Sequence, residues 1–253
     1  MKWLRYEHKG KVFYGFLTDA GLVAAAAGLP WEGAAPTGHT AALSDVTVLA
    51  PCQPEKIVCV GVNYLDHAQE SNRSLPPEPL IFLKPPTAVI GPGEAIVHPD
   101  ISDNVHYEGE LAIVIKKRCR AVKKDEAAEY IFGCTCANDV TARDLQRKDI
   151  QFTRAKSFDT FCPLGPYIET GFDFAGGEIK TRLNGRLVQS SNINRLIFKV
   201  PEIIEFISKV MTLCPGDVIL TGTPGGVGRM QDGDLVEVEI EGIGVLKNTV
   251  IGG

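Results

Sequence analysis

The stretch HYEGELAIVI, residues 106–115, places two carboxylates at the start of a strongly apolar segment. Successive side chains of a strand point to opposite faces, so we expect Glu108 and Glu110 on the same face, roughly 7 Å apart along the backbone. The residues that follow are apolar on both faces: Leu111, Ala112, Ile113, Val114 and Ile115. Because a strand that is apolar on both faces is buried, this segment predicts an internal strand that carries two carboxylates at its mouth.

A second acidic segment, VEVEIE at 236–241, has the same spacing and a different setting. Its three glutamates alternate with apolar residues that occupy the opposite face: Val236, Val238 and Ile240. One face is polar and the other apolar, so these glutamates are expected to face water. The distinguishing signal at Glu108 and Glu110 is therefore the apolar continuation on both faces, and the spacing itself is not informative.

Two carboxylates at the mouth of a buried strand repel each other and lose hydration, so a cation or a shared proton has to compensate them. A third carboxylate, Asp139, follows a short predicted strand in CTCANDV, residues 134–140. Three monodentate carboxylates leave about three positions of an octahedron for water or a chelating substrate, which suits Mg²⁺ or Mn²⁺. The alternative is an acidic surface patch without a metal.

Basic residues follow Asp139. In TARDLQRKD, residues 141–149, Arg143 shares a helix face with Gln146 and with Arg147. A guanidinium beside a metal is well placed for a substrate carboxylate, whereas the alternative is a solvated arginine in a helix salt bridge. Further on, Lys156 in RAKSFD is positioned to neutralise an enolate or a carboxylate, although a lone lysine is usually a surface charge.

Two further segments carry polar groups. VGVNYLDHAQE, residues 60–70, holds His67 and Glu70 three residues apart, an arrangement that lets a carboxylate orient imidazole as a general base; the alternative is a structural pair. GTPGGVG, residues 222–228, lacks the Lys-Ser/Thr of a P-loop and the context of a dinucleotide site. At Gly222 and Thr223 we expect a turn that approaches an anionic ligand, with the threonine hydroxyl as a donor.

Composition limits the class of protein. The 253 residues are 44% hydrophobic with a formal net charge of −5, and no basic stripe suited to nucleic acid is present. The apolar run at 21–29 is too short to span a bilayer, so no membrane partner is expected and the protein is predicted to be cytoplasmic. The seven cysteines lack zinc spacing and fit a reducing compartment. For Cys134 and Cys136, buried packing is favoured over a soft-metal site.

The chain divides by pattern into a small N-terminal module, residues 1–53, and a larger domain, residues 54–253. The module shows short strands and a loose segment at 30–40. In the larger domain, helices are expected at 125–133, at 141–149 with a capping box of Thr141 and Asp144, and at 201–211. The predicted class is α+β and β-rich, without a regular βαβ rhythm.

In this order, the segments resemble the fumarylacetoacetate hydrolase (FAH) family from about residue 56 to the C-terminus. The motifs that carry the resemblance are NYLDHAQE, PLIFLKPPTAVIGPG, HYEGELAIVI, NDVTARDLQ, AKSFDTFCPLGP, LNGRLVQ and CPGDVILTGTPGGVG. The resemblance implies a mixed β-sandwich roll with a small, variable N-terminal module, and a homodimer.

The resemblance also implies roles for individual residues. Glu108, Glu110 and Asp139 match the family's Mg²⁺ ligands, and His67 with Glu70 matches its water-activating pair. The positions that match substrate-carboxylate, oxyanion and loop contacts are Arg143, Gln146, Lys156, Gly222 and Thr223. Lys84, in FLKP, also falls on a family motif, but neither it nor His106 is given a role.

These matches predict a Mg²⁺- or Mn²⁺-dependent enzyme that acts on a small 2-oxo acid. The expected reaction is hydrolysis of a C–C bond, as in acylpyruvate or fumarylacetoacetate, or decarboxylation of oxaloacetate through an enolate. One alternative is a 2-hydroxyhepta-2,4-diene-1,7-dioate isomerase of aromatic catabolism. Another is a noncatalytic module that binds 2-oxo acids, because residue identity at the metal cannot choose among these outcomes.

Overall fold

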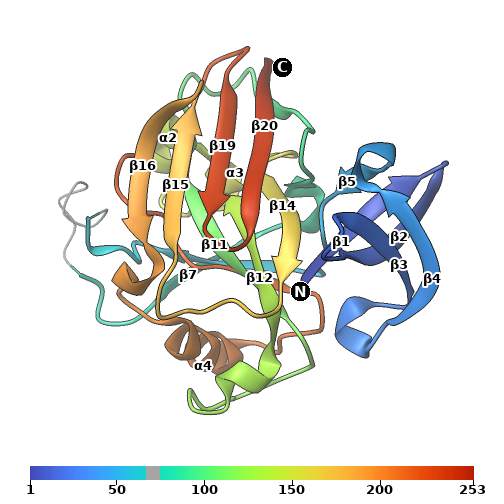
Figure 1. Cartoon of the computed structure of the whole chain (residues 1–253). Coiled ribbons are helices and arrows are strands. Elements are labelled where there is room, and N and C mark those ends of the chain that lie inside the picture. The colour runs from blue at the N-terminus through green and yellow to red at the C-terminus, as the bar shows by residue number, and fades with distance from the viewer. Residues whose placement is uncertain (67–74) are drawn as a thin grey trace.

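The computed structural model describes residues 1–66 and 75–253. Within these ranges the strands pair into three sheets, and short helices lie around them. Figure 1 shows the first five strands grouped at one side, the C-terminal strands β15, β16, β19 and β20 side by side, and helix α4 at the lower end. The predicted α+β, β-rich class is confirmed.

The N-terminal strands form a meander that joins the main sheet. They are β1 (Lys2–His8), β2 (Lys11–Leu17), β3 (Leu22–Ala27), β4 (Ala35–Ala42) and β5 (Thr47–Leu49), with 3₁₀ turns at Pro30–Glu32 and Leu43–Asp45. The prediction of a loose segment at 30–40 was wrong, because β4 pairs with β3 at the sheet edge. Strand β1 pairs with β14. The ring centroid of Trp3 in β1 lies 6.3 Å from that of Phe132, and the Phe132 ring also contacts the Trp31 ring.

The main sheet continues through the larger domain in the order β1-β14-β12-β11-β17-β6-β7. Its strands there are β6 (Ile57–Gly61), β7 (Leu80–Lys84), β11 (Gly109–Ile115), β12 (Ile131–Asn138), β14 (Cys162–Glu169) and β17 (Val218–Leu220), with β8 (Val89–Ile90) beside β14. Strand β11 is therefore internal, with β12 on one side and β17 on the other.

Two smaller sheets complete the fold. One contains β16 (Arg186–Asn192), β15 (Glu178–Leu183), β19 (Leu235–Ile240), β20 (Gly244–Gly252) and β9 (Ile96–His98). The other contains β13 (Thr141–Ala142), β10 (Val105–Tyr107) and β18 (Gly228–Arg229). The helices are α2 (Arg143–Lys148), α3 (Thr153–Lys156) and α4 (Val200–Val210), and further 3₁₀ turns lie at Pro86–Ala88, Ala127–Tyr130 and Ile193–Arg195.

All seven residues of β11 are buried, as the apolar pattern predicts. Leu111, Ile113 and Ile115 pack into a core shared with α4 and the sheet of β15 and β19. Ala112 and Val114 point to the opposite core, which contains side chains of β14 and β17. The strand that carries Glu110 is thus fixed by packing on both faces, which leaves its register little freedom to slip.

Strand β19 provides the contrast predicted for the second acidic segment. Val236, Val238 and Ile240 are buried on one face. On the other face Glu237 pairs with Lys247 at 2.7 Å, and Glu239 pairs with Arg182 and has a side chain that is 39% exposed. The Glu237 side chain is 14% exposed, so the same alternation gives a partly solvated, ion-paired acidic face here and a buried acidic site in β11.

Two helix predictions differ from the structure. The helix expected at 125–133 was wrong: a 3₁₀ turn at Ala127–Tyr130 leads into β12, because the β-prone residues that follow pair with β11. The helix after Asp139 is present as α2, but its capping box was wrong. The Thr141 hydroxyl donates to the Asp139 carbonyl at 2.8 Å, and Asp144 accepts from Ser102 at 2.6 Å.

The helix expected at 201–211 is confirmed as α4, whose Ile203, Ile204 and Ile207 are buried. All seven cysteines have free thiols, and Cys134 and Cys136 are buried in the apolar core, as packing predicts. Within the described ranges no helix combines the length and apolar character needed to cross a membrane.

Candidate metal centre and active site

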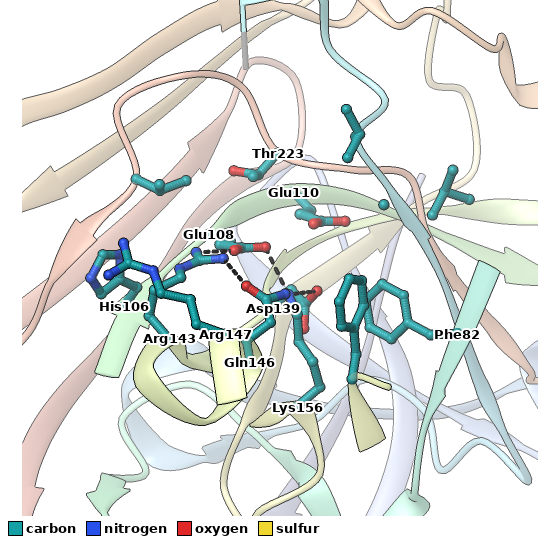
Figure 2. A pocket seen from close by; sticks show the side chains of 15 residues that line it. Phe82, His106, Glu108, Glu110, Asp139, Arg143, Gln146, Arg147, Lys156 and Thr223 are labelled. Atoms are coloured by element: carbon teal, nitrogen blue, oxygen red, sulfur yellow. Dashed lines mark hydrogen bonds and ion pairs between the residues drawn. The ribbon is translucent and has the colours of Figure 1, made fainter. Parts of the chain in front are cut away.

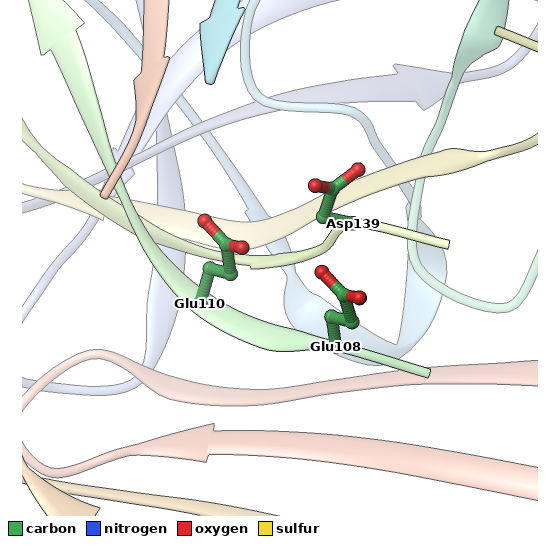
Figure 3. Close-up of side chains that lie close together, drawn as sticks. All are labelled: Glu108, Glu110 and Asp139. Carbon is green, nitrogen blue, oxygen red and sulfur yellow. The ribbon is translucent and has the colours of Figure 1, made fainter. Parts of the chain in front are cut away.

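Three carboxylates converge where β11 and β12 pair. Glu108 lies between β10 and β11, Glu110 is the second residue of β11, and Asp139 follows the last residue of β12. The register places Gly109 opposite Asn138. The Asp139 amide donates to the Glu108 carbonyl at 2.8 Å, and the Asn138 side chain accepts from the Glu108 amide at 2.9 Å. Pairing of the two strands therefore brings the three carboxylates together (Figure 3).

The donor set fits a hard divalent cation. One oxygen from each carboxylate lies within 4.8 Å of the others, and all three residues are at most 5% exposed. Mg²⁺ binds oxygen at about 2.1 Å, so ligand oxygens on opposite sides of one ion lie about 4.2 Å apart, and small side-chain movements bring the set together. Three carboxylates leave coordination positions for a chelating substrate, and Mn²⁺ accepts the same oxygen donors.

Glu110 is the carboxylate with the least compensation. Burial raises its pKa well above the usual value, and the charges of Asp139 and Glu108 raise it further. The charge of Lys156 lowers this pKa, and so does the Gly222 amide, which donates to the Glu110 carboxylate at 2.7 Å, but together they offset only part of the rise. A bound cation would compensate the remaining charge, so burial and electrostatics agree with the donor geometry in favouring a metal site.

Two buried lysines neutralise the other carboxylates. Lys156 donates to Glu108 at 2.8 Å and to Asp139 at 2.6 Å. Burial lowers the pKa of Lys156, but Asp139 and Glu108 raise it by more, so the ammonium group stays charged. Lys84 donates to the second Asp139 oxygen at 2.6 Å and to the Val140 carbonyl at 3.2 Å. Asp139 therefore lies between two ammonium groups.

Sequence reasoning gave no role to Lys84, and the structure shows why. It ends the apolar run LIFL of β7, and it is only 1% exposed. A lysine at a buried position of a strand needs an anionic partner, but the apolar run did not reveal this burial, because Leu80 and Leu83 of the same run are exposed. The structure identifies that partner as Asp139.

Helix α2 directs its basic face at the same cavity, as its spacing predicts. Arg143 forms an ion pair with Glu108 and donates to the Gln146 side chain at 2.6 Å. Arg147, one turn further along, also lines the cavity (Figure 2). The predicted proximity of Arg143, Gln146 and Lys156 to the carboxylates is thus present in the structure.

The loop after β17 supports the carboxylates, and the contact of Gly222 and Thr223 with a ligand stays a prediction. The Gly222 amide is occupied by Glu110. The Thr223 hydroxyl donates to the Gly109 carbonyl at 2.9 Å and accepts from Gln189 at 2.9 Å. Thr223 still lines the cavity, but both groups are engaged by the protein, so their first role is to hold β11 in place. Gln189, which also accepts from the Gly109 amide at 3.0 Å, was missed from sequence.

Of the two histidines considered from the sequence, only His106 lies among the described residues. His67 and its predicted partner Glu70 lie outside the described residues. His106 lines the cavity; its Nε2 lies 2.9 Å from the Asn104 side-chain oxygen, and its Nδ1 has no hydrogen-bond partner among the described residues. Burial, with the charge of Arg143, lowers the pKa of His106 to about 4, so its imidazole is neutral at pH 7.

The cavity measures about 350 Å³ and is polar at one side and apolar at the other. Its polar wall is formed by the carboxylates and the basic residues already described. Its apolar wall includes Val60, Phe82 and Phe152. The rings of Phe82 and Phe152 meet edge to face, with their centroids 5.5 Å apart. This volume lies near the lower end of the range for ligand sites, so the cavity suits a small, highly charged ligand.

Comparison with known proteins gives the class of protein to which this fold and site correspond. The family model described as "Fumarylacetoacetate (FAA) hydrolase C-terminal" matches residues 56–251, and "Rv2993c-like, N-terminal" matches residues 1–51. The chain belongs to the fumarylacetoacetate hydrolase family of enzymes, as the sequence motifs predict. The division at residue 53 stays a prediction.

Particular relatives are named for proton-transfer reactions. A Bos taurus protein named as a mitochondrial oxaloacetate tautomerase is 47% identical over 82% of this chain and 70% of its own length. A solved structure of 5-carboxymethyl-2-hydroxymuconate delta-isomerase from Mycobacterium smegmatis is 45% identical, with a TM-score of 0.95 and full coverage of both chains. A solved structure of 2-hydroxyhepta-2,4-diene-1,7-dioate isomerase from Mycobacterium marinum is 44% identical, with a TM-score of 0.93. The match covers 100% of this chain and 98% of that protein's chain.

Proposed function

We propose that this protein is a Mg²⁺- or Mn²⁺-dependent enzyme that moves a proton next to the 2-oxo group of a small dicarboxylic acid, with keto–enol tautomerisation of oxaloacetate as the first candidate reaction. The observation that carries the proposal is the buried set of Glu108, Glu110 and Asp139 with cationic side chains around it. The named relatives support the reaction class, since a tautomerase and two isomerases relocate protons.

The charges of the site favour a dianionic ligand. Around the metal position, Lys84, Lys156 and Arg143 equal the three carboxylates in number, although within the described part of the chain they pair only with Glu108 and Asp139. Arg147 is left out of this count because it is exposed to solvent. A divalent ion held by the carboxylates adds two positive charges, which a dicarboxylate neutralises on entering the low-dielectric cavity. A neutral ligand would leave this charge buried and uncompensated, so the cavity should discriminate strongly against it.

The metal, held by Glu108, Glu110 and Asp139, would polarise the 2-oxo group as a Lewis acid. Arg143 is held in a fixed orientation by Glu108 and Gln146, so its remaining N–H groups can orient a substrate carboxylate. Lys156 keeps its proton and presents a fixed positive charge to the negative charge that develops on the substrate oxygen. The apolar wall of Phe82 and Phe152 limits access of water.

The proposal is tested by following the ultraviolet absorbance of the enol of oxaloacetate, with release of pyruvate measured in parallel. We expect faster interconversion with Mg²⁺ or Mn²⁺, loss with EDTA, and return when metal is restored. Glu110→Gln should bind Mn²⁺ at least about 100-fold more weakly in calorimetry, since it loses an anionic ligand. Glu239→Gln, from the acidic face of β19, is the matched control, because its side chain is 39% exposed, and it should behave as wild type. Interconversion that persists equally in EDTA and in Glu110→Gln would contradict the proposal.

A second candidate is isomerisation of 2-hydroxyhepta-2,4-diene-1,7-dioate, the compound for which one similar solved structure is named, and a second similar structure is also named as an isomerase. That compound also has carboxylates at both ends, so the charge argument applies to it equally. A change in its ultraviolet spectrum with conservation of mass would identify this reaction. The reactions predicted from the sequence, C–C hydrolysis and decarboxylation, would each release two products, which the same assays would detect. Hydrolysis would also require His67 and Glu70 to activate water.

We also propose that the protein assembles as a homodimer, as the family resemblance implies. Edge strand β7 carries the exposed apolar side chains of Leu80 and Leu83, and Ile150 after α2 is 99% exposed. Apolar side chains gathered at a sheet edge are typical of a surface covered in an assembly. Light scattering of the eluting protein should give about twice the mass of the chain, and a monomer would refute this proposal.

A further inference from the structure

Arg147 is a cation of the cavity wall for which the metal centre provides no partner. Arg143, Gln146 and Arg147 occupy one face of α2, and all three line the cavity (Figure 2). Arg143 uses part of its guanidinium to bind Glu108 and Gln146, next to the metal position. Arg147, by contrast, forms no hydrogen bond or ion pair with any residue that the structure describes. Its guanidinium is therefore available to a ligand.

The acidic residues nearest to Arg147 in sequence are engaged elsewhere. Asp144, on the same helix, accepts from the Ser102 hydroxyl at 2.6 Å and from the Asp103 amide at 3.1 Å. Asp149, which follows the helix, accepts two hydrogen bonds from Arg154, at 2.6 and 2.8 Å. A helix salt bridge, the ordinary explanation for an arginine at this spacing, is thus absent from the described structure.

The remaining cations of the site lie at the metal-binding end. Lys84 and Lys156 pair with Asp139, and Arg143 pairs with Glu108. These groups surround the position where the chelating end of a 2-oxo acid would bind. Arg147 lies one helical turn beyond Arg143, roughly 6 Å further along the helix. The carboxyl carbons of an extended dicarboxylate lie roughly 4 Å apart with four carbons, as in oxaloacetate, and roughly 5 Å apart with five, so the long Arg147 side chain has to span only the small remaining distance.

We infer that Arg147 binds the distal carboxylate of the substrate and so selects dicarboxylic over monocarboxylic 2-oxo acids. The inference rests on the proposed function, because it assumes that the other end of the ligand chelates the metal. Arg147 is exposed, whereas the residues at the metal are buried. Its long side chain can therefore follow tails of different length, which allows one residue to serve several dicarboxylates.

Calorimetric titration of the Mn²⁺-loaded protein tests this inference with three probes. Oxalate chelates but has no tail, 2-oxopentanoate has an apolar tail, and 2-oxoglutarate has a tail of the same length that ends in a carboxylate. The test variant is Arg147→Met, which removes the charge and keeps an extended side chain, and Arg147→Lys keeps the charge. Lys148→Met, an exposed cation on the next residue of the same helix, is the matched control.

We expect wild type and Lys148→Met to bind 2-oxoglutarate about tenfold more tightly than 2-oxopentanoate, as for one partly exposed charge-assisted contact. Arg147→Met should lose this preference and keep its affinity for oxalate, and Arg147→Lys should retain part of it. A preference that persists in Arg147→Met would overturn the inference, as would equal weakening of all three probes in that variant.

The wild type separates failure of the inference from failure of the proposed function. If wild type binds oxalate but does not prefer 2-oxoglutarate, the role of Arg147 is wrong and the metal site stands. If wild type binds Mn²⁺ but none of the three probes, the proposed function is wrong and the inference falls with it. Thermal unfolding of each variant checks that folding is unchanged, as expected for an exposed side chain.

Discussion

Replacing Lys156 with methionine should separate the stability of the site from its chemistry. The side chain is 3% exposed and makes two charge-assisted hydrogen bonds, 2.8 Å to Glu108 and 2.6 Å to Asp139. Methionine keeps the apolar stem and removes the charge, so two buried carboxylates lose a counter-ion. Breaking a buried ion pair costs about 3–5 kcal/mol. Because Lys84 and Arg143 still compensate part of the charge, we expect about 3 kcal/mol in the free energy of unfolding.

For a chain of this size, 1 kcal/mol shifts the melting temperature by about 2–4 °C, so Lys156→Met should melt about 6–12 °C below wild type in EDTA. A divalent ion replaces the missing positive charge. At a concentration 100 times its dissociation constant a ligand stabilises by about 2.7 kcal/mol, so Mn²⁺ should restore most of the loss. The rise on adding Mn²⁺ should be larger than in wild type, where the ion competes with the ammonium group for the same oxygens.

The assay is thermal unfolding followed by circular dichroism, with and without EDTA, alongside the tautomerase assay. Lys148→Met is the control, because its side chain is exposed and should change the free energy of unfolding by less than about 0.5 kcal/mol. Restored melting without restored activity would show that Lys156 acts in the chemistry as well as in folding. A variant that melts within about 2 °C of wild type in EDTA would refute the electrostatic reasoning.

The remaining predictions concern the support of the metal ligands. Asn63→Ala removes bonds of 2.7 Å to the Thr221 carbonyl and of 3.1 and 2.7 Å to the Phe198 backbone, and urea unfolding should show a loss of about 2–4 kcal/mol. Gly222 has a φ of +102°, and a Cβ added there would lie only 2.8 Å from that of Asn63. Gly222→Ala should therefore lower the free energy of unfolding by about 1–3 kcal/mol and weaken Mn²⁺ binding in calorimetry. Unchanged affinity would contradict the role of the Gly222 amide. Glu110→Gln should unfold at equal or higher urea concentration than wild type in EDTA, because it relieves repulsion among buried carboxylates; a lower midpoint would count against that repulsion.

Local patterns in the sequence were sufficient to predict burial where the spacing of apolar residues within one segment indicates which of its faces are buried. The double apolar face of 111–115 predicted the burial of β11, and the helical spacing of Ile203, Ile204 and Ile207 predicted the buried face of α4. The sequence placed Glu108 and Glu110 at the start of one predicted strand and Asp139 at the end of another, but it did not predict the antiparallel pairing of β11 with β12 that brings them together. Their roles as metal ligands, like the other site assignments, stay predictions.

Local sequence patterns gave wrong or no predictions where contacts with distant residues determine the secondary structure or the partner of a side chain. Residues 125–133 have a helix-like composition, but pairing with β11 places Ile131 in a strand. Thr141 has the form of a helix cap and instead bonds back to Asp139, where it fixes the turn that carries a metal-ligand candidate. The partner of Lys84 lies 55 residues away in sequence, so no local pattern reveals it.

The pairing of β1 with β14 has a consequence for recombination between relatives. The first strand belongs to the small N-terminal unit and also covers an edge of the main sheet, where Trp3 lies opposite Ile168 and contacts Phe132. An N-terminal unit taken from another family member must therefore bring side chains that complement Phe132 and Ile168. A fusion that neglects these contacts would uncover the end of strand β14 at Ile168 and Glu169, where it could pair with other chains.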